Sequence, residues 1–428
     1  MTRSDTTRRS FLQSSAVAGA AAITVPATAA QAATGASLPT GKVVVVVFQR
    51  GGADFLNLFA PTGDANYAVL RPTIGIRPPG SPSGTVGLAM DSTFSMHPSM
   101  AGVHAAFTAQ ASKCAIVHSV GYAPANRSHF VSEALYETSL QVNQLDGWIN
   151  RHLQVSSGPG QGPVRALALR GSLPRSMMGT HPAYAVASTR DLVLDGVADE
   201  KTVLRSVIEQ TTTAGMDLNR HNAYRSGIDA LGLIDLFSVL TPATYQPANG
   251  AVYPTSASVG SSTSTSITSF GRQMKEIAEV IKAGLGIEFF AVDQGGWDHH
   301  HSLQSYIAPL AADLSQGISA FFTDLGALAS DVVVVTMSEF GREARQNGSS
   351  GTDHGVGGAM MVWGGQVLGG QVRGIWPGVA TSALQDGRFL AARNDYRDVL
   401  REVLTSHMGG TDPNFVFPGR TYQPIGLF

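Results

Sequence analysis

The chain has 428 residues, 43% of them hydrophobic, which is enough for one large domain or two ordinary ones with a substantial core. Its 29 basic and 31 acidic residues give a net charge of -2, so no global field attracts nucleic acid or an anionic membrane, and nucleic acid is not an expected partner. Cys114 is the only cysteine, which excludes an intrachain disulfide, and its strand setting predicts a small buried hydrophobic residue.

The first 32 residues have the features of an export signal. Segment 7–12, TRRSFL, has the twin-arginine spacing, a mildly apolar Ala-rich stretch follows, and 30–32, AQA, is a small-residue cleavage signal. The sequence therefore predicts a twin-arginine signal peptide over 1–32, either cleaved or retained as an anchor. The twin-arginine translocase is the expected partner during export, and the location is periplasmic or secreted. No run of 18 or more apolar residues follows, so we do not expect the mature protein to span a membrane.

Apolar runs without polar alternation predict strands buried on both faces, as in a parallel sheet. They are 43–48 (VVVVVF), 114–120 (CAIVHSV), 164–169 (VRALAL), 184–188 (YAVAS), the start of 287–301 (IEFFAVDQGGWDHHH), 332–336 (VVVVT) and 359–363 (AMMVW).

Apolar residues at helical spacing lie between these strands. The predicted helices are 99–109, a helix from about 128, parts of 198–240, 270–285 and 303–329. The repeated order of strand, polar loop and helix predicts an α/β fold. We expect a doubly wound, mostly parallel sheet with helices on both faces, in a single domain over 40–428. The Ser/Thr-rich stretch at 245–269 is either a flexible loop or a junction with the second half of the domain.

Asp54 follows the first predicted strand and the glycine pair of 49–54 (QRGGAD). Ligands of open α/β sheets bind at the carboxyl ends of the strands, so Asp54 is a candidate ligand residue. The alternative is a helix cap or turn residue, which is common for an aspartate after two glycines. His97, in the loop-rich stretch from 60 to 100, either reaches the same edge or forms hydrogen bonds at the surface.

Arg127, Ser128 and His129 follow the second predicted strand at the start of a helix. A helix N-terminus favours an anion or an ionised oxygen, so Ser128 is a candidate nucleophile, with Arg127 and His129 beside it. A cation next to a hydroxyl at this position suits a phosphoryl or sulfuryl oxygen. The alternative is that Ser128 is a plain N-cap.

Asp298 stands directly before three histidines, at the end of the strand that begins 287–301. A carboxylate together with imidazoles is a donor set that zinc or manganese accepts. Glu339 also follows a predicted strand and therefore reaches the same edge. His354 lies in a glycine-rich loop before a strand, so it needs a different route to that edge.

Five motifs together resemble a large family of twin-arginine-exported bacterial proteins in the alkaline-phosphatase-like superfamily, which contains sulfatases and phosphomutases. The motifs are RGGxD (50–54), RSHF (127–130), GGWDxH (295–300), SEFGR (338–342) and TDHG (352–355). This resemblance covers nearly the whole mature chain. It implies an alkaline-phosphatase-like fold with a site for one or two divalent ions, whether zinc, manganese or calcium. The implied metal ligands are Asp54, Asp298, His300, Glu339 and His354, and the implied nucleophile is Ser128. His300 is preferred to His299 because the motif reads Gly-Trp-Asp-x-His.

One position departs from the pattern of the superfamily. Where phosphatases read Ser-Asp-His-Gly, this chain has Ser338-Glu339-Phe340-Gly341, so Phe340 replaces a metal-ligating histidine. The open alternatives are that His299, His301 or Asp353 substitutes for it, that the site holds one metal, or that hydrolysis is lost.

The expected function is an exported metal-dependent hydrolase of a phosphate or sulfate ester. Metal ions would polarise the ester oxygens, Ser128 would attack in line, and Arg127, Arg342 or Arg50 would hold the anionic oxygens. The alternative is a non-catalytic exported binding or assembly protein that retains the fold with a degenerate metal site. Phe340 is the residue that favours the alternative.

Overall fold

The computed structural model describes most of the chain, with gaps near the N-terminus and in the middle. The described residues are 41–141, 146–156, 164–192, 201–203, 205–206 and 230–428. The predicted signal peptide lies outside them, as does much of the helical prediction over 198–240; of the latter, residues 230–237 are helical. Within the described residues, no helix is both long and apolar enough to cross a membrane.

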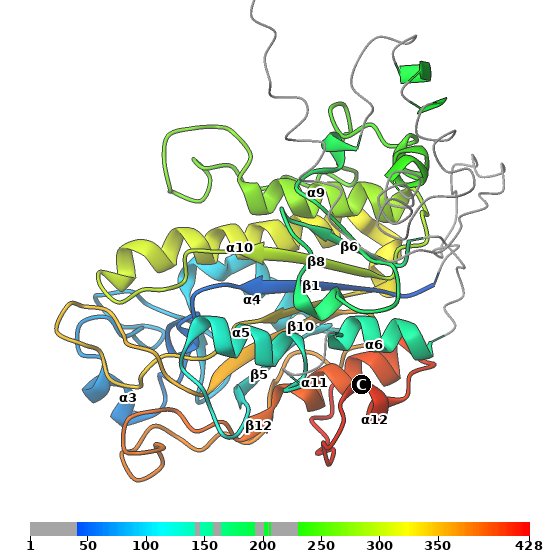
Figure 1. The fold of residues 1–428 in the computed structure, drawn as a ribbon. Helices are drawn as coiled ribbons and strands as arrows, with labels where there is room; N and C mark the ends of the chain where they lie inside the picture. The colour runs from blue at the N-terminus through cyan, green and yellow to red at the C-terminus, as the bar shows by residue number, and fades with distance from the viewer. Residues whose placement is uncertain (1–40, 142–145, 157–163, 193–200, 204, 207–229) are drawn as a thin grey trace, which may run out of the picture.

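A large central sheet forms the middle of the molecule (Figure 1). Its hydrogen-bonded order is β11-β5-β10-β9-β1-β8-β6-β7, and β12 pairs with β5. These strands are β1 (Val43–Gln49), β5 (Cys114–Gly121), β6 (Ala166–Leu169), β7 (Tyr184–Val186), β8 (Phe289–Gln294), β9 (Val332–Met337), β10 (Gly358–Gly364), β11 (Val372–Arg373) and β12 (Asn394–Asp395). A small second sheet has the order β2 (Phe59–Ala60), β4 (Ser95–Met96) and β3 (Leu88–Ala89).

β1 lies in the centre of the sheet and is buried on both faces. Val45 pairs with Phe290 of β8 and with Val334 of β9, and both pairings are parallel. Val45 and Val47 belong to one hydrophobic cluster, while Val44 and Val46 belong to the cluster on the other face. Because neither face meets water, the strand needs no polar alternation, which explains its run of valines.

β10 is the one long strand of the described sheet that runs against the others. It pairs antiparallel with both β5 and β9, so β5 points in the same direction as β9, β1 and β8. The carboxyl ends of these four strands therefore meet at one edge of the sheet. The amino end of the reversed β10 lies at that edge too, which is the route by which the loop before it, with His354, arrives there.

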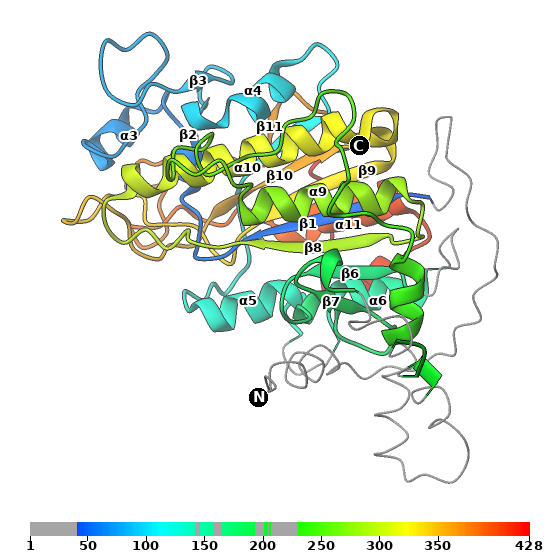
Figure 2. The same cartoon turned by 90° about the horizontal axis from the view of Figure 1, so that it is seen from above.

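Helices cover both faces of the sheet, as Figures 1 and 2 show. One face packs against α4 (Ala101–Thr108), α9 (Ser269–Lys282) and α10 (Leu303–Leu325). The other packs against α5 (His129–Glu137), α6 (Trp148–Val155), α11 (Tyr396–Glu402) and α12 (Pro413–Val416). The remaining short elements are α2 (Phe55–Leu58), α3 (Ala65–Leu70), the 3-10 turns η1 (Pro98–Met100), η2 (Arg175–Met177), η3 (Thr189–Asp191) and η4 (Gly326–Asp331), and a π-helical turn, η5 (Val403–Met408).

The structure confirms an α/β architecture with a mostly parallel sheet flanked by helices. The predicted helix 270–285 corresponds to α9, which begins where Thr268 accepts a hydrogen bond from Gly271 N at 2.9 Å. Its apolar face, with Phe270, Met274 and Ile277, is buried in the core. Cys114 is buried in β5, as predicted.

The Ser/Thr-rich stretch 245–269 is bound to α10 at several points, of which Asp324 makes the most hydrogen bonds. Asp324 of α10 accepts hydrogen bonds from the hydroxyls of Tyr245 and Tyr253, each at 2.9 Å, and an ion pair from Lys282. Asp324 is completely buried. The stretch therefore makes contacts with α10 and leads into α9.

Candidate metal centre

Two loops meet at the edge where the parallel strands end. The loop after β1 passes so close to the loop after β8 that a Cβ on Gly51 would lie 2.5 Å from the backbone nitrogen of Asp298. Gly51 also has a φ of +119°, which favours glycine. The glycine pair after β1 is therefore needed to bring the two loops into contact.

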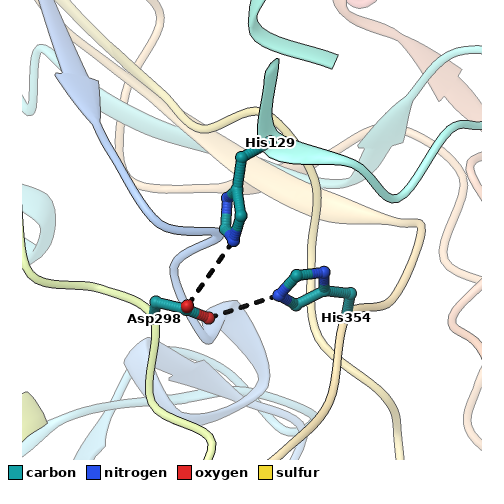
Figure 3. A group of neighbouring side chains, drawn as sticks. All are labelled: His129, Asp298 and His354. Atoms are coloured by element: carbon teal, nitrogen blue, oxygen red, sulfur yellow. Dashed lines mark hydrogen bonds and ion pairs between the residues drawn. The ribbon is translucent and has the colours of Figure 1, made fainter. Parts of the chain in front are cut away.

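His129, Asp298 and His354 form the centre of the candidate site (Figure 3). They come from the start of α5, the loop after β8 and the loop before β10. His129 Nε2 lies 3.5 Å from Asp298 Oδ2, and His354 Nε2 lies 3.3 Å from Asp298 Oδ1. One ligand atom from each residue lies within 4.8 Å of the others.

His300 borders this group on its exposed side. Its Nε2 lies 3.0 Å from Asp298 Oδ1 and 3.0 Å from His354 Nε2. The structure thus brings His300 to Asp298, as the Gly-Trp-Asp-x-His pattern suggests, whereas the ring of His299 is buried and stacks on Tyr306.

Each of the three histidines at the site turns its Nδ1 to an oxygen that can only accept a hydrogen bond. His129 faces Glu339 Oε1 at 2.7 Å, His354 faces the carbonyl of Arg127 at 2.8 Å, and His300 faces Asp353 Oδ1 at 2.8 Å. In a neutral ring these contacts place the proton on Nδ1 and the lone pair on Nε2, whereas the 3.0 Å contact between Nε2 of His300 and Nε2 of His354 requires a proton on one of the two rings unless a cation lies between them. The three lone pairs point towards one carboxylate, and His129 Nε2 makes no hydrogen bond to any described residue.

Imidazole nitrogens and a carboxylate are donors that a divalent metal ion accepts. Metal-ligating histidines usually donate their other ring N–H to a carboxylate or a backbone carbonyl, and that is the pattern seen here. Two donors bound at about 2.0–2.1 Å to a tetrahedral zinc ion lie about 3.4 Å apart. His354 Nε2 lies 3.3 Å from Oδ1 of Asp298 and His129 Nε2 lies 3.5 Å from its Oδ2, and one ligand atom from each residue lies within 4.8 Å of the others. His129, Asp298 and His354 are therefore a group of side chains that could hold a divalent ion.

The charges around the group act in opposite directions on a cation, because Glu339 and Asp298 attract it and the guanidinium of Arg342 repels it. The hydrogen bond to Glu339 raises the pKa of His129, because the nearby carboxylate stabilises positive charge on the ring. Partial burial alone would raise the pKa of Asp298, but the hydrogen bond and charge of Arg342 bring it below its ordinary value. Burial lowers the pKa of His354 and keeps that ring neutral. Asp298 is thus ionised and His354 is neutral, which are the forms that bind metals.

Glu339 and Asp54, both implied as metal ligands, lie behind the group. The carboxylate of Glu339 is fully buried, and its Oε1 accepts hydrogen bonds from His129 and from Gly51 N at 2.8 Å. Glu339 Oε2 accepts from Ser338 at 2.9 Å. Asp54 is equally buried and pairs with Arg71 at 2.7 Å. Both carboxylates are therefore engaged with protein donors.

Two of the predicted substrate-binding arginines also have other partners. Arg50 pairs with Glu133 at 3.4 Å, with Asp293 at 3.1 Å and with Glu137. Arg342 is buried and donates to backbone carbonyls and to Asp298.

Arg127 and Ser128 are exposed beside the centre. The guanidinium of Arg127 lies 4.4 Å from the ring centroid of Phe389 and makes no ion pair with any other described residue. Ser128 is the N-cap residue of α5, as predicted, but its side chain makes no capping hydrogen bond. Its hydroxyl is therefore not used by the helix.

Phe340 fills the place between two site histidines. Its ring centroid lies 4.9 Å from that of His129 and 4.7 Å from that of His354. The three suggested substitutes for the missing histidine have other positions. His299 and His301 both lie against Tyr306, and Asp353 accepts from His300.

Two residues that bind Asp54, Arg71 and Thr352, were not predicted from the sequence. Arg71 is fully buried, and Thr352 Oγ1 donates to Asp54 Oδ2 at 2.9 Å. No sequence signal distinguishes Arg71 from a surface arginine, since it lies 17 residues from its partner in a loop-rich stretch. His97 neither reaches the site nor lies at the surface; it is buried, and its Nδ1 accepts from Ser99 N at the start of η1.

The sequence also matches a known family over most of its length. No curated protein matches the chain. Residues 41–407 match the model of a family described as "Protein of unknown function (DUF1501)", and the chain belongs to this family.

Proposed function

We propose that the protein is an exported, metal-dependent hydrolase of a phosphate or sulfate ester. The observation that carries the proposal is the set of three histidines whose Nδ1 atoms are fixed by oxygen acceptors while their Nε2 atoms converge on Asp298. The proposal that the protein is exported rests on the twin-arginine pattern of residues 7–12 and on the cleavage signal at 30–32.

His129, Asp298 and His354 would hold the ion. Two imidazoles and one carboxylate favour zinc or manganese over calcium, which prefers six to eight oxygen ligands. Three protein ligands leave a coordination position open, as in catalytic zinc sites. The bound ion would supply Lewis-acid polarisation of the ester and a lowered pKa for the attacking water or hydroxyl.

Exposed groups around the centre supply the remaining functions. Arg127 would bind the anionic oxygens of the ester, because its guanidinium is exposed and free of ion pairs with described residues. Ser128 presents an unused hydroxyl next to His129 and would act as the nucleophile. His300, with Nδ1 fixed by Asp353, would take up or release a proton at Nε2.

Metal content and turnover test this function. Protein purified without chelator should contain zinc or manganese, and it should cleave an aryl phosphate, a phosphodiester or an aryl sulfate. Asp298→Ala should lose both metal and turnover, whereas Asp91→Ala, on the exposed loop between β3 and β4, should lose neither. A folded preparation with less than about a tenth of an equivalent of any divalent metal would refute the metal centre on which the proposal rests.

The second candidate is an exported binding or assembly protein that keeps this architecture without catalysis. The contacts of Phe340 with His129 and His354 favour it, because an apolar ring replaces a polar group within the site. In that case the Asp298→Ala variant would melt at a lower temperature, and the metal-loaded wild type would cleave none of the three ester classes.

A further inference from the structure

The guanidinium of Arg342 is enclosed by oxygen atoms next to the candidate metal centre. Its Nε donates to Gly52 O at 2.6 Å, and Nη1 donates to Thr352 O at 3.0 Å. Nη2 contacts the carbonyls of Gly51 and Trp297 and the Oδ1 atom of Asp298. The side chain is fully buried, so every partner is a fixed protein oxygen.

We propose that the centre holds a single divalent ion, and that the guanidinium of Arg342, which is bound to Asp298 Oδ1, supplies a permanent second positive charge beside it. This inference rests on the proposed metal centre and decides the number of ions in it. Arg342 acts as a positioning residue, because it contacts Asp298 and its side chain has no solvent exposure.

The carboxylate that a second ion would need is already shared. The ions of a two-metal site lie about 3.5–4 Å apart, so a second ion here would also need an oxygen of Asp298. Here Oδ1 of Asp298 is bound by Arg342, and only Oδ2 faces His129 without a hydrogen-bond donor. A bridging role would require Asp298 to release the guanidinium, which would leave a buried charge without its carboxylate partner.

The other groups implied for a second ion are also engaged. Asp54 is bound by Arg71 at 2.7 Å and by Thr352 at 2.9 Å, and it has no solvent exposure. Oε1 of Glu339 accepts two hydrogen bonds, its Oε2 lies 2.9 Å from the hydroxyl of Ser338, and Phe340 offers no ligand atom. Within the described residues, the ligand side chains that lie close enough to bind an ion are His129, Asp298 and His354, with His300 beside Asp298 and His354, and all of them surround the one carboxylate of Asp298. The donors present therefore suffice for one site.

Metal stoichiometry of the full-length protein tests the number of ions. Protein stripped with a chelator, reloaded with excess Zn²⁺ or Mn²⁺ and desalted should contain one equivalent by elemental analysis. The Mn²⁺ form should give the uncoupled electron paramagnetic resonance spectrum of an isolated ion. Two equivalents, or a spin-coupled spectrum, would overturn the single-ion inference and leave the proposed function standing. A content below about a tenth of an equivalent would overturn both.

A ligand variant gives an independent test. If His354 serves the only ion, His354→Ala should reduce the metal content from one equivalent to nearly none. In a two-metal site the same change would reduce it from two equivalents to one. His301→Ala is the matched control, because His301 is exposed against Tyr306 and should retain one equivalent. Retention of one equivalent by folded His354→Ala protein would contradict the proposed ligand set and, with it, the single-ion inference.

Discussion

Replacing Glu339 with glutamine keeps the size of the side chain and removes its negative charge. Glu339 Oε1 accepts the Nδ1–H of His129 at 2.7 Å and Gly51 N at 2.8 Å, and Oε2 accepts from Ser338 at 2.9 Å. The carboxylate thus fixes the ring of His129 and makes its Nε2 a stronger ligand. Loss of such a partner typically weakens metal affinity 10- to 100-fold, or by about 1.4 to 2.7 kcal/mol. We expect Glu339→Gln to weaken zinc binding by that factor.

Competition with a chromophoric chelator at pH 7.5 measures this change directly. The matched control is Glu343→Gln, because Glu343 pairs at the surface with Arg388 and makes no side-chain contact with the site histidines. Melting of the metal-free proteins separates a general loss of stability from a loss of affinity. Zinc affinity of Glu339→Gln within twofold of wild type would refute the role assigned to this carboxylate.

Three further changes test the fold around the site. Gly52→Ala should cost about 2 to 5 kcal/mol in unfolding free energy, since φ is +69° and the new Cβ would lie 2.3 Å from Cε2 of Phe340. Burial lowers the pKa of His118 to about 4, below its unfolded value of about 6.5, so the unfolded chain binds the extra proton as the pH falls. Stability should therefore drop by about 2 kcal/mol from this residue between pH 7 and 5, and His118→Gln should flatten that dependence in urea titrations. Asp324→Asn should lower the free energy of unfolding by about 2 to 4 kcal/mol and expose 245–269 to proteolysis. The reason is that the hydroxyls of Tyr245 and Tyr253, the backbone N–H of Ala248 and the ammonium of Lys282 all lose a charged acceptor.

For each of these three predictions, one experimental result would contradict the stated reason. Gly250 has a similar φ of +71°, and a Cβ added there would have no atom within 4 Å, so an equal cost for Gly250→Ala would exclude the contact with Phe340 as the cause. An unchanged pH slope for His118→Gln would show that His118 does not bind a proton on unfolding. Wild-type resistance of Asp324→Asn to elastase would show that other contacts hold the loop.

The strands were predictable because a strand that is buried on both faces has apolar residues at every position. The valines of 43–48 and 332–335 lack polar alternation, and the structure buries all of them. The direction of β10 was not predictable, because AMMVW has the same pattern whichever way the strand runs. Direction depends on the hydrogen-bonding partners, β5 and β9, which lie far away in the sequence or on the other side of a long loop.

The sequence predicted that the site residues would lie at one edge of the sheet, because most of them follow strands. It did not predict which residues each of them contacts. Asp54 and Asp298 look alike in the sequence, since each follows a glycine-containing turn after a strand. One is buried with Arg71, and the other is 45% exposed and faces three histidines. The difference depends on which arginine packs against which carboxylate over separations of 17 and 44 residues, and local sequence does not encode such packing.

The central position of β1 has a consequence for how the protein is made. Residues 43–49 are synthesised early, yet their two partners are residues 289–294 and 332–337, so the strand has no neighbour until some 240 further residues exist. Until then a run of five valines and a phenylalanine, which has high β-propensity and no charge, is available for intermolecular pairing. The sheet can close only after nearly the whole chain has left the ribosome. We therefore expect the nascent chain to depend on a chaperone that covers its first strand.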